Sequence, residues 1–240
     1  MNSTITQAVI LAGGEGRRLL PYTKVLPKPL WPVGNIPIVV ILIKQLAASG
    51  VTDIIMAVGH QAELIKTILG NGSQFGVKIK YSIEYKPLGT AGPLRKMKGL
   101  NSDFLVLNGD ILTNLPLADL IASHLNNKSI ATIAVHRRSF NVDFGIVEHK
   151  NNMVVKYLEK PKLKYLVSMG IYVFNKAIVK QIPNGKFDFP QLVNKLIKSG
   201  MNPFIYKFDG HWLDIGRTED WEQADRLFQR KSELFLSRPE

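Results

Sequence analysis

Two aspartates in glycine-flanked turns have the residue type and setting for metal chemistry. Asp110 closes the run Asn108-Gly-Asp110, and Asp214 lies in Trp212-Leu-Asp-Ile-Gly216. Two carboxylates that the fold brings together could hold Mg²⁺ against phosphate oxygens. Each aspartate alone could equally cap a helix or form a turn. The pair therefore predicts a metal site on the condition that both aspartates meet in the fold.

A glycine-rich loop near the N-terminus offers groups for phosphate. Its three glycines allow backbone N–H groups to approach an anion, and two arginines and a lysine add positive charge. The residues are Gly13, Gly14, Gly16, Arg17, Arg18 and Lys28. The loop lacks the third glycine of the dinucleotide fingerprint and the G-x-x-x-x-G-K-[ST] pattern of common NTPases. A plain tight turn would not need the cations, so an oligophosphate site is favoured.

Composition restricts the class of protein. The 240 residues suit one α/β domain, and no apolar run reaches the roughly 18 residues of a membrane span. The start has no basic region typical of a signal peptide and the chain has no cysteine, so we expect a cytoplasmic protein. The five histidines show no metal-ligand spacing and are expected on the surface or in the core.

The net charge of +12 has three interpretations. Nucleic-acid binding is disfavoured, because the lysines and arginines are scattered without a dense block. A positive cleft would instead steer anionic small molecules such as a triphosphate and a sugar phosphate. Most of the remaining charges are expected on a solvated surface.

The apolar pattern predicts the elements that must position these groups. In the first half, strands over 7–12, 53–58, 78–83 and 104–107 alternate with helices over 37–49, 61–69 and 117–126. This order predicts a Rossmann-like, mostly parallel sheet with helices on both faces. Polar residues follow four strand ends and should meet at one edge of the sheet: Gly13 and Gly14, Gly59 and His60, Glu84, and Asn108 to Asp110.

The second half has a different pattern. Strands over 131–136, 145–149, 154–159 and 166–174 have little helix between them, which predicts a mixed or antiparallel part. Helices over 188–199 and 218–235 and a strand over 203–208 complete the chain. We expect one domain, 1–240, whose parts divide near residue 130.

Five motifs together resemble the sugar-1-phosphate nucleotidyltransferases over about residues 7–226. They are Leu11-Ala-Gly-Gly-Glu-Gly-Arg-Arg-Leu with Pro27-Lys-Pro, Leu88-Gly-Thr-Ala-Gly-Pro-Leu94, Asn108-Gly-Asp110, Glu159-Lys-Pro161 and Trp212-Leu-Asp-Ile-Gly216. The resemblance implies transfer of a nucleotidyl group to a sugar 1-phosphate with Mg²⁺ and release of pyrophosphate. Relatives often carry a C-terminal β-helix domain, which we do not expect here.

The resemblance also assigns roles to residues. It implies that Arg18, Lys28, Asp110 and Asp214 are catalytic, with both aspartates on Mg²⁺. The implied nucleotide site comprises Leu11, Ala12, Gly13, Gly14, Gly16, Arg17, Glu84, Gly89, Thr90 and Asn108. Residues 1–130 would thus bind the nucleotide. Residues 131–240 would bind the sugar phosphate through Gly145, Glu159, Lys160, Ser168 and Gly170.

Two departures and one motif bear on the substrate. Arg17 stands where the family has Thr, and Ser168 where it usually has Asn. Leu88-Gly-Thr-Ala-Gly-Pro-Leu94 looks most like the mannose-1-phosphate guanylyltransferase branch. We therefore expect GTP with mannose 1-phosphate or a manno-configured heptose 1-phosphate.

Four alternatives stay open at this point. The chain could be a thymidylyl- or uridylyltransferase for glucose 1-phosphate, or a non-catalytic regulatory subunit on the same fold. It could also be a cytidylyltransferase for a non-sugar alcohol phosphate, although Glu159-Lys-Pro161 argues against this, and a nucleic-acid-binding protein is the weakest alternative. A homo-oligomer is compatible with the sequence.

Overall fold

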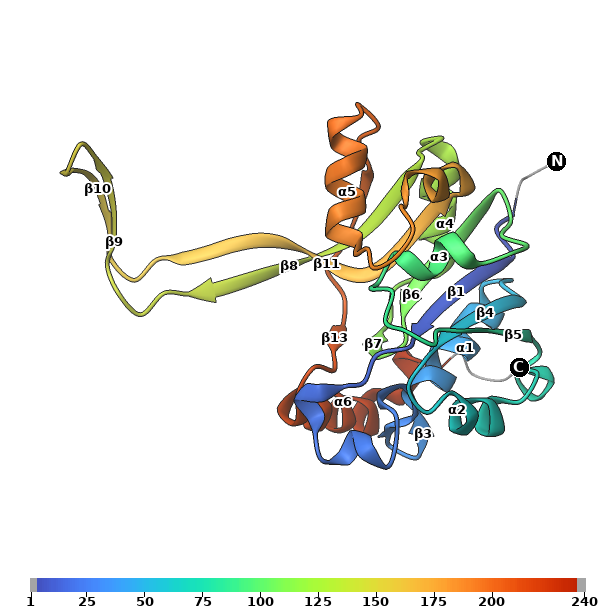
Figure 1. The fold of residues 1–240 in the computed structure, drawn as a ribbon. Helices are drawn as coiled ribbons and strands as arrows, with labels where there is room; N and C mark the ends of the chain where they lie inside the picture. The colour runs from blue at the N-terminus through green and yellow to red at the C-terminus, as the bar shows by residue number, and fades with distance from the viewer. Residues whose placement is uncertain (1–3, 237–240) are drawn as a thin grey trace.

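A seven-stranded sheet forms the centre of the protein in a computed structural model that describes residues 4–236. Its strand order is β12-β8-β11-β6-β1-β4-β5 (Figure 1). The strands are β1 (Gln7–Ala12), β4 (Asp53–Val58), β5 (Lys78–Ile83), β6 (Asp103–Asn108), β8 (Ala131–Asn141), β11 (Lys162–Asn175) and β12 (Phe204–Phe208). β6, β1, β4 and β5 run parallel, whereas β11 pairs antiparallel with both β6 and β8. The mostly parallel first half and the mixed second half are both confirmed.

Helices cover both faces of this sheet. Successive side chains of β1 point to opposite faces of the sheet, so Ala8 and Ile10 pack into one apolar core and Val9 packs into another. The first core also holds residues of α1 (Ile38–Ala48), α2 (Ala62–Leu69) and α4 (Leu117–Asn126). The second holds residues of α3 (Gly92–Lys96) and α5 (Phe189–Lys198). The parallel strands are therefore buried on both sides, as their continuous apolar runs predict.

A third, smaller core supports the N-terminal loop. This loop between β1 and α1 contains three 3₁₀ turns, at Arg17–Leu19, Tyr22–Lys24 and Lys28–Leu30, followed by the short strands β2 (Pro32–Val33) and β3 (Ile36–Pro37). Val33 packs with Ala224 and Phe228 of α6 (Thr218–Lys231). The last helix thus braces the loop. It ends at Lys231 rather than at the predicted residue 235, because the chain tightens there into a 3₁₀ turn over Ser232–Leu234.

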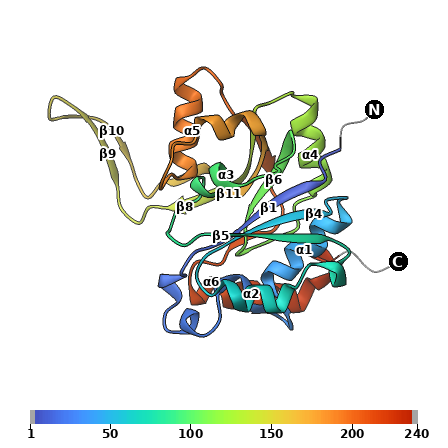
Figure 2. The same cartoon turned by 45° about the vertical axis from the view of Figure 1, so that its right-hand side comes forward.

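The predicted strands over 145–149 and 154–159 exist but do not join the central sheet. They form the separate hairpin of β9 (Ile146–Lys150) and β10 (Met153–Leu158). The hairpin sits at the end of the outer parts of β8 and β11, which run far past the sheet in both views (Figures 1 and 2). We call residues 137–167 the arm.

Candidate active site

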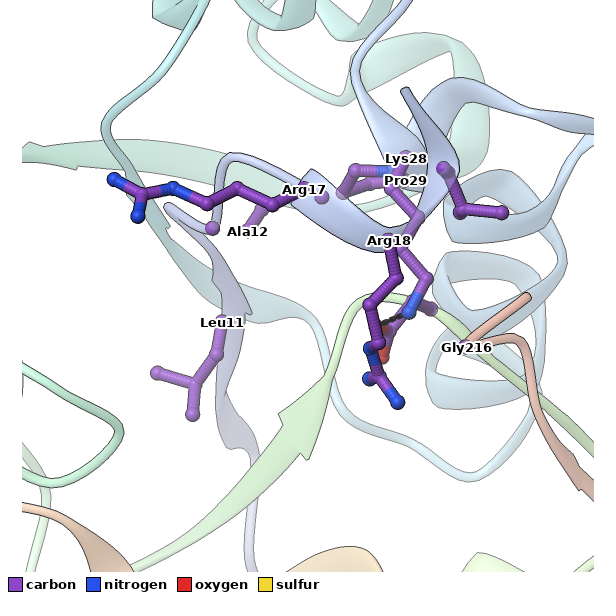
Figure 3. Close-up of a pocket in the computed structure, with 11 residues that line it drawn as sticks. Leu11, Ala12, Arg17, Arg18, Lys28, Pro29 and Gly216 are labelled. Carbon is purple, nitrogen blue, oxygen red and sulfur yellow. Dashed lines mark hydrogen bonds and ion pairs between the residues drawn. The ribbon is translucent and has the colours of Figure 1, made fainter. Parts of the chain in front are cut away.

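A cavity of about 270 Å³ opens where β1 and β6 end and the N-terminal loop folds over them (Figure 3). Its lining combines backbone of the glycine loop with charged side chains: Leu11, Ala12, Gly14, Gly16, Arg17, Arg18, Leu19, Lys28, Pro29, Asp110 and Gly216. Ligands of open α/β sheets bind at this carboxyl edge. The fold therefore gathers most of the predicted phosphate-binding residues at one place.

Lys28 is the buried cation of this cavity. Its residue is only 9% exposed, and its ammonium pairs with the carboxylate of Asp110 (Figure 3). Pro27 and Pro29 flank it in a 3₁₀ turn, which fixes the backbone and aims the side chain inward. A charge this buried costs free energy unless it is paired. The site therefore holds Lys28 and Asp110 as a preorganised pair.

Asp214 lies beside Asp110 because two short strands pair. β13 (Trp212–Asp214) runs antiparallel to β7 (Ile111–Thr113) with Asp214 opposite Ile111, and the Ile215 N–H donates to the Asp110 carbonyl at 3.1 Å. The Asp214 side chain is exposed and is not among the residues that line the cavity, but partial burial of its carboxyl and then the Asp110 charge raise its pKa. Two repelling carboxylates are what a divalent cation would neutralise, so they fit a metal.

Two carboxylates are few ligands for a hard cation. The described residues contain no group of three or more His, Cys, Asp or Glu side chains placed to hold a metal. Mg²⁺ commonly takes one or two carboxylates and completes its shell with waters and substrate phosphate oxygens. The pair Asp110 and Asp214 suits that mode of binding.

The two adjacent arginines point in different directions (Figure 3). Arg17 extends away from Lys28, its side chain is 81% exposed, and it pairs with Glu15 at 2.7 Å. Arg18 turns toward Gly216, where a side chain would come within 3.1 Å of its guanidinium. Its charge is also close enough to lower the pKa of Asp214, against the larger raising effects. Both arginines line the cavity, but only Arg18 directs its guanidinium toward the side of Gly216 and Asp214.

A second cavity, of about 300 Å³, continues along the same sheet edge. It is lined by Leu11, Gly13, Gly14, Glu84, Pro87, Leu88, Gly89, Thr90, Asn108 and Asp110. Asp110 lines both cavities, so they adjoin. Glu84 accepts from the Leu88 N–H at 3.2 Å, and burial raises the pKa of its carboxyl. A planar ligand here would lie against backbone and a hydrogen-bonding carboxylate.

Asp188 supports this second cavity and was not predicted as a site residue. Its carboxylate accepts from the Thr90 N–H at 2.8 Å, and the Thr90 hydroxyl accepts from the Phe189 N–H at 2.8 Å. Gly89 has φ +75°, and any side chain there would meet the Phe187 carbonyl at 2.7 Å. The capping pattern before Phe189 signals a helix start in the sequence, but not its contact with the loop of Thr90.

The predicted sugar-side residues fall into two groups. Ser168 and Gly170 lie at the root of the arm, where a side chain on Gly170 would come within 2.5 Å of the Asn108 amide. Gly145, Glu159 and Lys160 lie instead in the links that join the outer ends of β8 and β11 to the β9–β10 hairpin. The fold therefore does not bring these three residues to the cavities of their own chain.

Comparison with known proteins identifies the family to which this chain belongs. The family described as "Nucleotidyl transferase" matches residues 7–231. Curated mannose-1-phosphate guanyltransferases of Yarrowia lipolytica and Schizosaccharomyces pombe are 34% and 35% identical in alignments 239 positions long, which cover 92% of this chain. The chain spans 64% of the length of these relatives.

Solved structures agree with this assignment. A putative glucose-1-phosphate thymidylyltransferase from Bacillus anthracis has TM-score 0.74 at 27% identity, covering 92% of this chain and 94% of its own. HddC from Yersinia pseudotuberculosis in complex with GMP-PN has TM-score 0.72 at 27% identity, covering 93% and 100%. No helix among residues 4–236 is long and apolar enough to cross a membrane. The charged cleft, the fold and the matched residues together show that the chain belongs to the nucleotidyl transferase family.

Proposed function

We propose that this protein transfers a nucleotidyl group from a nucleoside triphosphate to a sugar 1-phosphate and releases pyrophosphate. The observation that carries the proposal is the Lys28–Asp110 pair in the cavity beside the glycine loop, with Asp214 next to Asp110 and a second cavity adjoining. A phosphoryl-type transfer needs positioning and charge neutralisation rather than a protein nucleophile. The residues that line the two cavities supply both the positioning and the charge neutralisation.

Each residue has a defined part in this reaction. The loop amides and Arg18 bind the β- and γ-phosphates, and Lys28 faces the α-phosphorus and offsets the charge that develops as the sugar phosphate oxygen attacks. Asp110 and Asp214 would hold Mg²⁺, which supplies Lewis-acid polarisation of the phosphates when bound. The pairing with Lys28 holds the Asp110 side chain in position. Residues lining the second cavity, Glu84, Gly89 and Thr90 among them, receive the base.

The proposed substrates are GTP and mannose 1-phosphate or a manno-configured heptose 1-phosphate. The relatives named mannose-1-phosphate guanyltransferase support GTP and mannose 1-phosphate. HddC bound to GMP-PN supports a guanine nucleotide. Ser168 replaces the Asn usual in the family, which is the reason to test heptoses. The thymidylyltransferase among the similar structures keeps dTTP with glucose 1-phosphate as the second candidate.

We propose that residues 1–130 bind the nucleotide and residues 131–240 the sugar phosphate, as parts of one catalytic domain. Glu159 would bind sugar hydroxyls and Lys160 the sugar phosphate, while Ser168 and Gly170 line the junction with Asn108. The proposed location is the cytoplasm, because a chain without cysteine suits a reducing compartment.

The test is a grid of five triphosphates against several sugar 1-phosphates, read by pyrophosphate release with MgCl₂. A kcat/KM optimum at GTP with a manno-configured sugar supports the proposal. An optimum at dTTP or UTP would leave the reaction class standing and replace the substrates. Release with no pair, together with a thermal shift on adding triphosphate, would point to the regulatory-subunit alternative.

A further inference from the structure

The arm carries sugar-side residues away from the site of its own chain. The β8–β11 ladder runs from the Ser168–Val135 pair to the Lys162–Asn141 pair, six residue steps in the arm. At about 3.4 Å per residue this is roughly 20 Å. Glu159 and Lys160 lie just beyond that end, between β10 and β11. The β9–β10 hairpin at this end lies away from β1 in both views (Figures 1 and 2). One chain therefore presents the two halves of the proposed site far apart.

The arm also exposes far more apolar surface than an isolated segment in water should. Its aromatic residues Phe140, Phe144, Tyr157 and Tyr165 are 51%, 78%, 61% and 54% exposed. At about 200 Å² per aromatic side chain, these fractions amount to roughly 500 Å². Further exposed apolar residues add to it: Val147, Met153, Val154, Val155 and Leu166. Patches of this size mark protein contacts, and a standard interface buries about 800 Å² per partner.

An apolar groove lined by aromatic residues lies next to the phosphate cavity. It has a volume of about 610 Å³ and is lined by Tyr22, Val25, Leu26, Trp31, Pro32, Thr218, Trp221 and Glu222; we call it the tryptophan groove. Trp31 stacks edge-on with both Tyr22 and Trp221, at 5.9 Å between ring centroids. Tyr22 and Val25 are 60% and 79% exposed. The groove shares the N-terminal loop with the phosphate cavity, so an occupant would reach the site.

The arm is basic, and the groove has carboxylates at its rim. The arm has seven lysines and arginines against three carboxylates. The tryptophan groove is bounded by the first turns of α6, which carry Glu219, Asp220 and Glu222. Glu222 pairs with Arg226 at 3.5 Å, and Lys24 lies between the lining residues Tyr22 and Val25, so the rim of the groove carries both signs of charge. Opposite charges at the rim of an apolar contact favour and orient association. The basic arm can therefore meet exposed Glu219 at the rim, while the apolar surfaces of arm and groove form the main contact.

We propose that the arm of one copy docks in the tryptophan groove of a second copy and that its Glu159 and Lys160 complete the second copy's sugar-phosphate site. The inference rests on the proposed function for the role of these two residues, and it names the partner as another copy of this chain. A two-fold pair in which each arm serves the other chain gives two equal sites and leaves neither arm exposed. Activity would then require the dimer.

A mixed-variant experiment tests the contribution between copies. Lys28→Met disables the pocket and Lys160→Met disables the arm, and each alone should retain little activity. Co-expression with two affinity tags yields the mixed dimer, which has one site with both parts intact and one with both disabled. We expect about half of the wild-type kcat per dimer, or about one-quarter in an unsorted mixture. No recovery, with an active wild type, would overturn the inference.

Cross-linking gives a readout that needs no activity. Since the chain has no cysteine, Val25→Cys and Val154→Cys each introduce a single thiol at an exposed position. A short bismaleimide should join a mixture of the two variants into a dimer band. The matched control, Ile197→Cys on α5 with Val154→Cys, should give none.

The outcomes separate the two proposals. A cross-link within one doubly substituted chain, with no dimer at working concentration by light scattering, would show that the arm folds back on its own chain and refute the inference. Pyrophosphate release by wild type in that case would leave the proposed function intact. A cross-linked dimer without any release would refute the proposed function instead, and with it the catalytic role of the arm.

Discussion

Replacing Lys28 by methionine removes the buried cation while keeping most of the side-chain volume. The ammonium pairs with the carboxylate of Asp110, whose side chain is 24% exposed. Its positive charge also acts to lower the pKa of Asp214. Without it the Asp110 carboxylate in the cavity and the nearby Asp214 lose their cation, and the site loses the group that faces the α-phosphorus in our mechanism. Loss of one preorganised electrostatic stabiliser lowers kcat by roughly 10² to 10³, or about 2.7–4 kcal/mol. We expect kcat/KM to fall by a similar factor.

The same substitution affects stability less than its burial suggests. Removing one partner of a fully buried pair costs about 3–5 kcal/mol. Asp110 opens onto the cleft, where water can solvate its carboxylate after the lysine is gone. We therefore expect the free energy of unfolding to fall by only about 1–2 kcal/mol. Adding Asp110→Asn to Lys28→Met should restore part of that loss, since it removes the unpaired charge.

The assay is steady-state pyrophosphate release beside urea unfolding followed by tryptophan fluorescence. Lys24→Met is the matched control, because Lys24 lies in the same loop but is exposed. The control should keep kcat/KM within a factor of two or so, as surface substitutions do. If Lys28→Met retained near-normal kcat/KM, or lost activity only in proportion to unfolded protein, the assignment of Lys28 to the reacting centre would be refuted.

Three further predictions concern other parts of the structure. Arg18→Ala should lower kcat/KM more than Arg17→Ala, because the Arg17 side chain extends away from Lys28 and pairs with Glu15; the opposite ranking in the same assay would contradict the geometry. Gly170→Ala should lower kcat/KM at least tenfold and the urea midpoint too, since φ is +72° and the new side chain would push Asn108 aside, and unchanged kinetics would refute that contact. Burial lowers the pKa of His124 in the folded protein. Below about pH 6.5 the imidazole is therefore protonated more in the unfolded state than in the folded state, which favours unfolding. The free energy of unfolding should thus fall from pH 7 to 5 more steeply in wild type than in His124→Gln; parallel curves would contradict this.

The nucleotide half of the fold could be predicted because its signals are local. Continuous apolar runs such as residues 53–58 predict buried parallel strands, and polar residues after their ends predict a shared edge. Pairing across the sheet then follows from the alternation of strand and helix. The order of strands and helices is enough to predict that Gly13, Glu84 and Asn108 meet at one cavity.

The arm could not be predicted in the same way. A strand pattern over 145–149 indicates extended chain, but not whether its partner lies in the central sheet or in a separate hairpin. The meeting of Asp110 and Asp214 depends on the three-residue strands β7 and β13, which are too short to carry a periodic signal. The contact between Asp188 and Thr90 likewise joins residues far apart in the chain, with no pattern to announce it.

The central claim is that a sugar phosphate oxygen attacks the α-phosphorus of the triphosphate at the Lys28 and Asp110 cluster. The most direct measurement supplies mannose 1-phosphate with ¹⁸O in its non-bridging phosphate oxygens, together with unlabelled GTP and MgCl₂, and analyses both products by mass spectrometry. We predict that all the label stays in the nucleotide sugar and that the pyrophosphate is unlabelled. Label in the pyrophosphate, or turnover that yields GDP or GMP without a nucleotide sugar, would contradict the account.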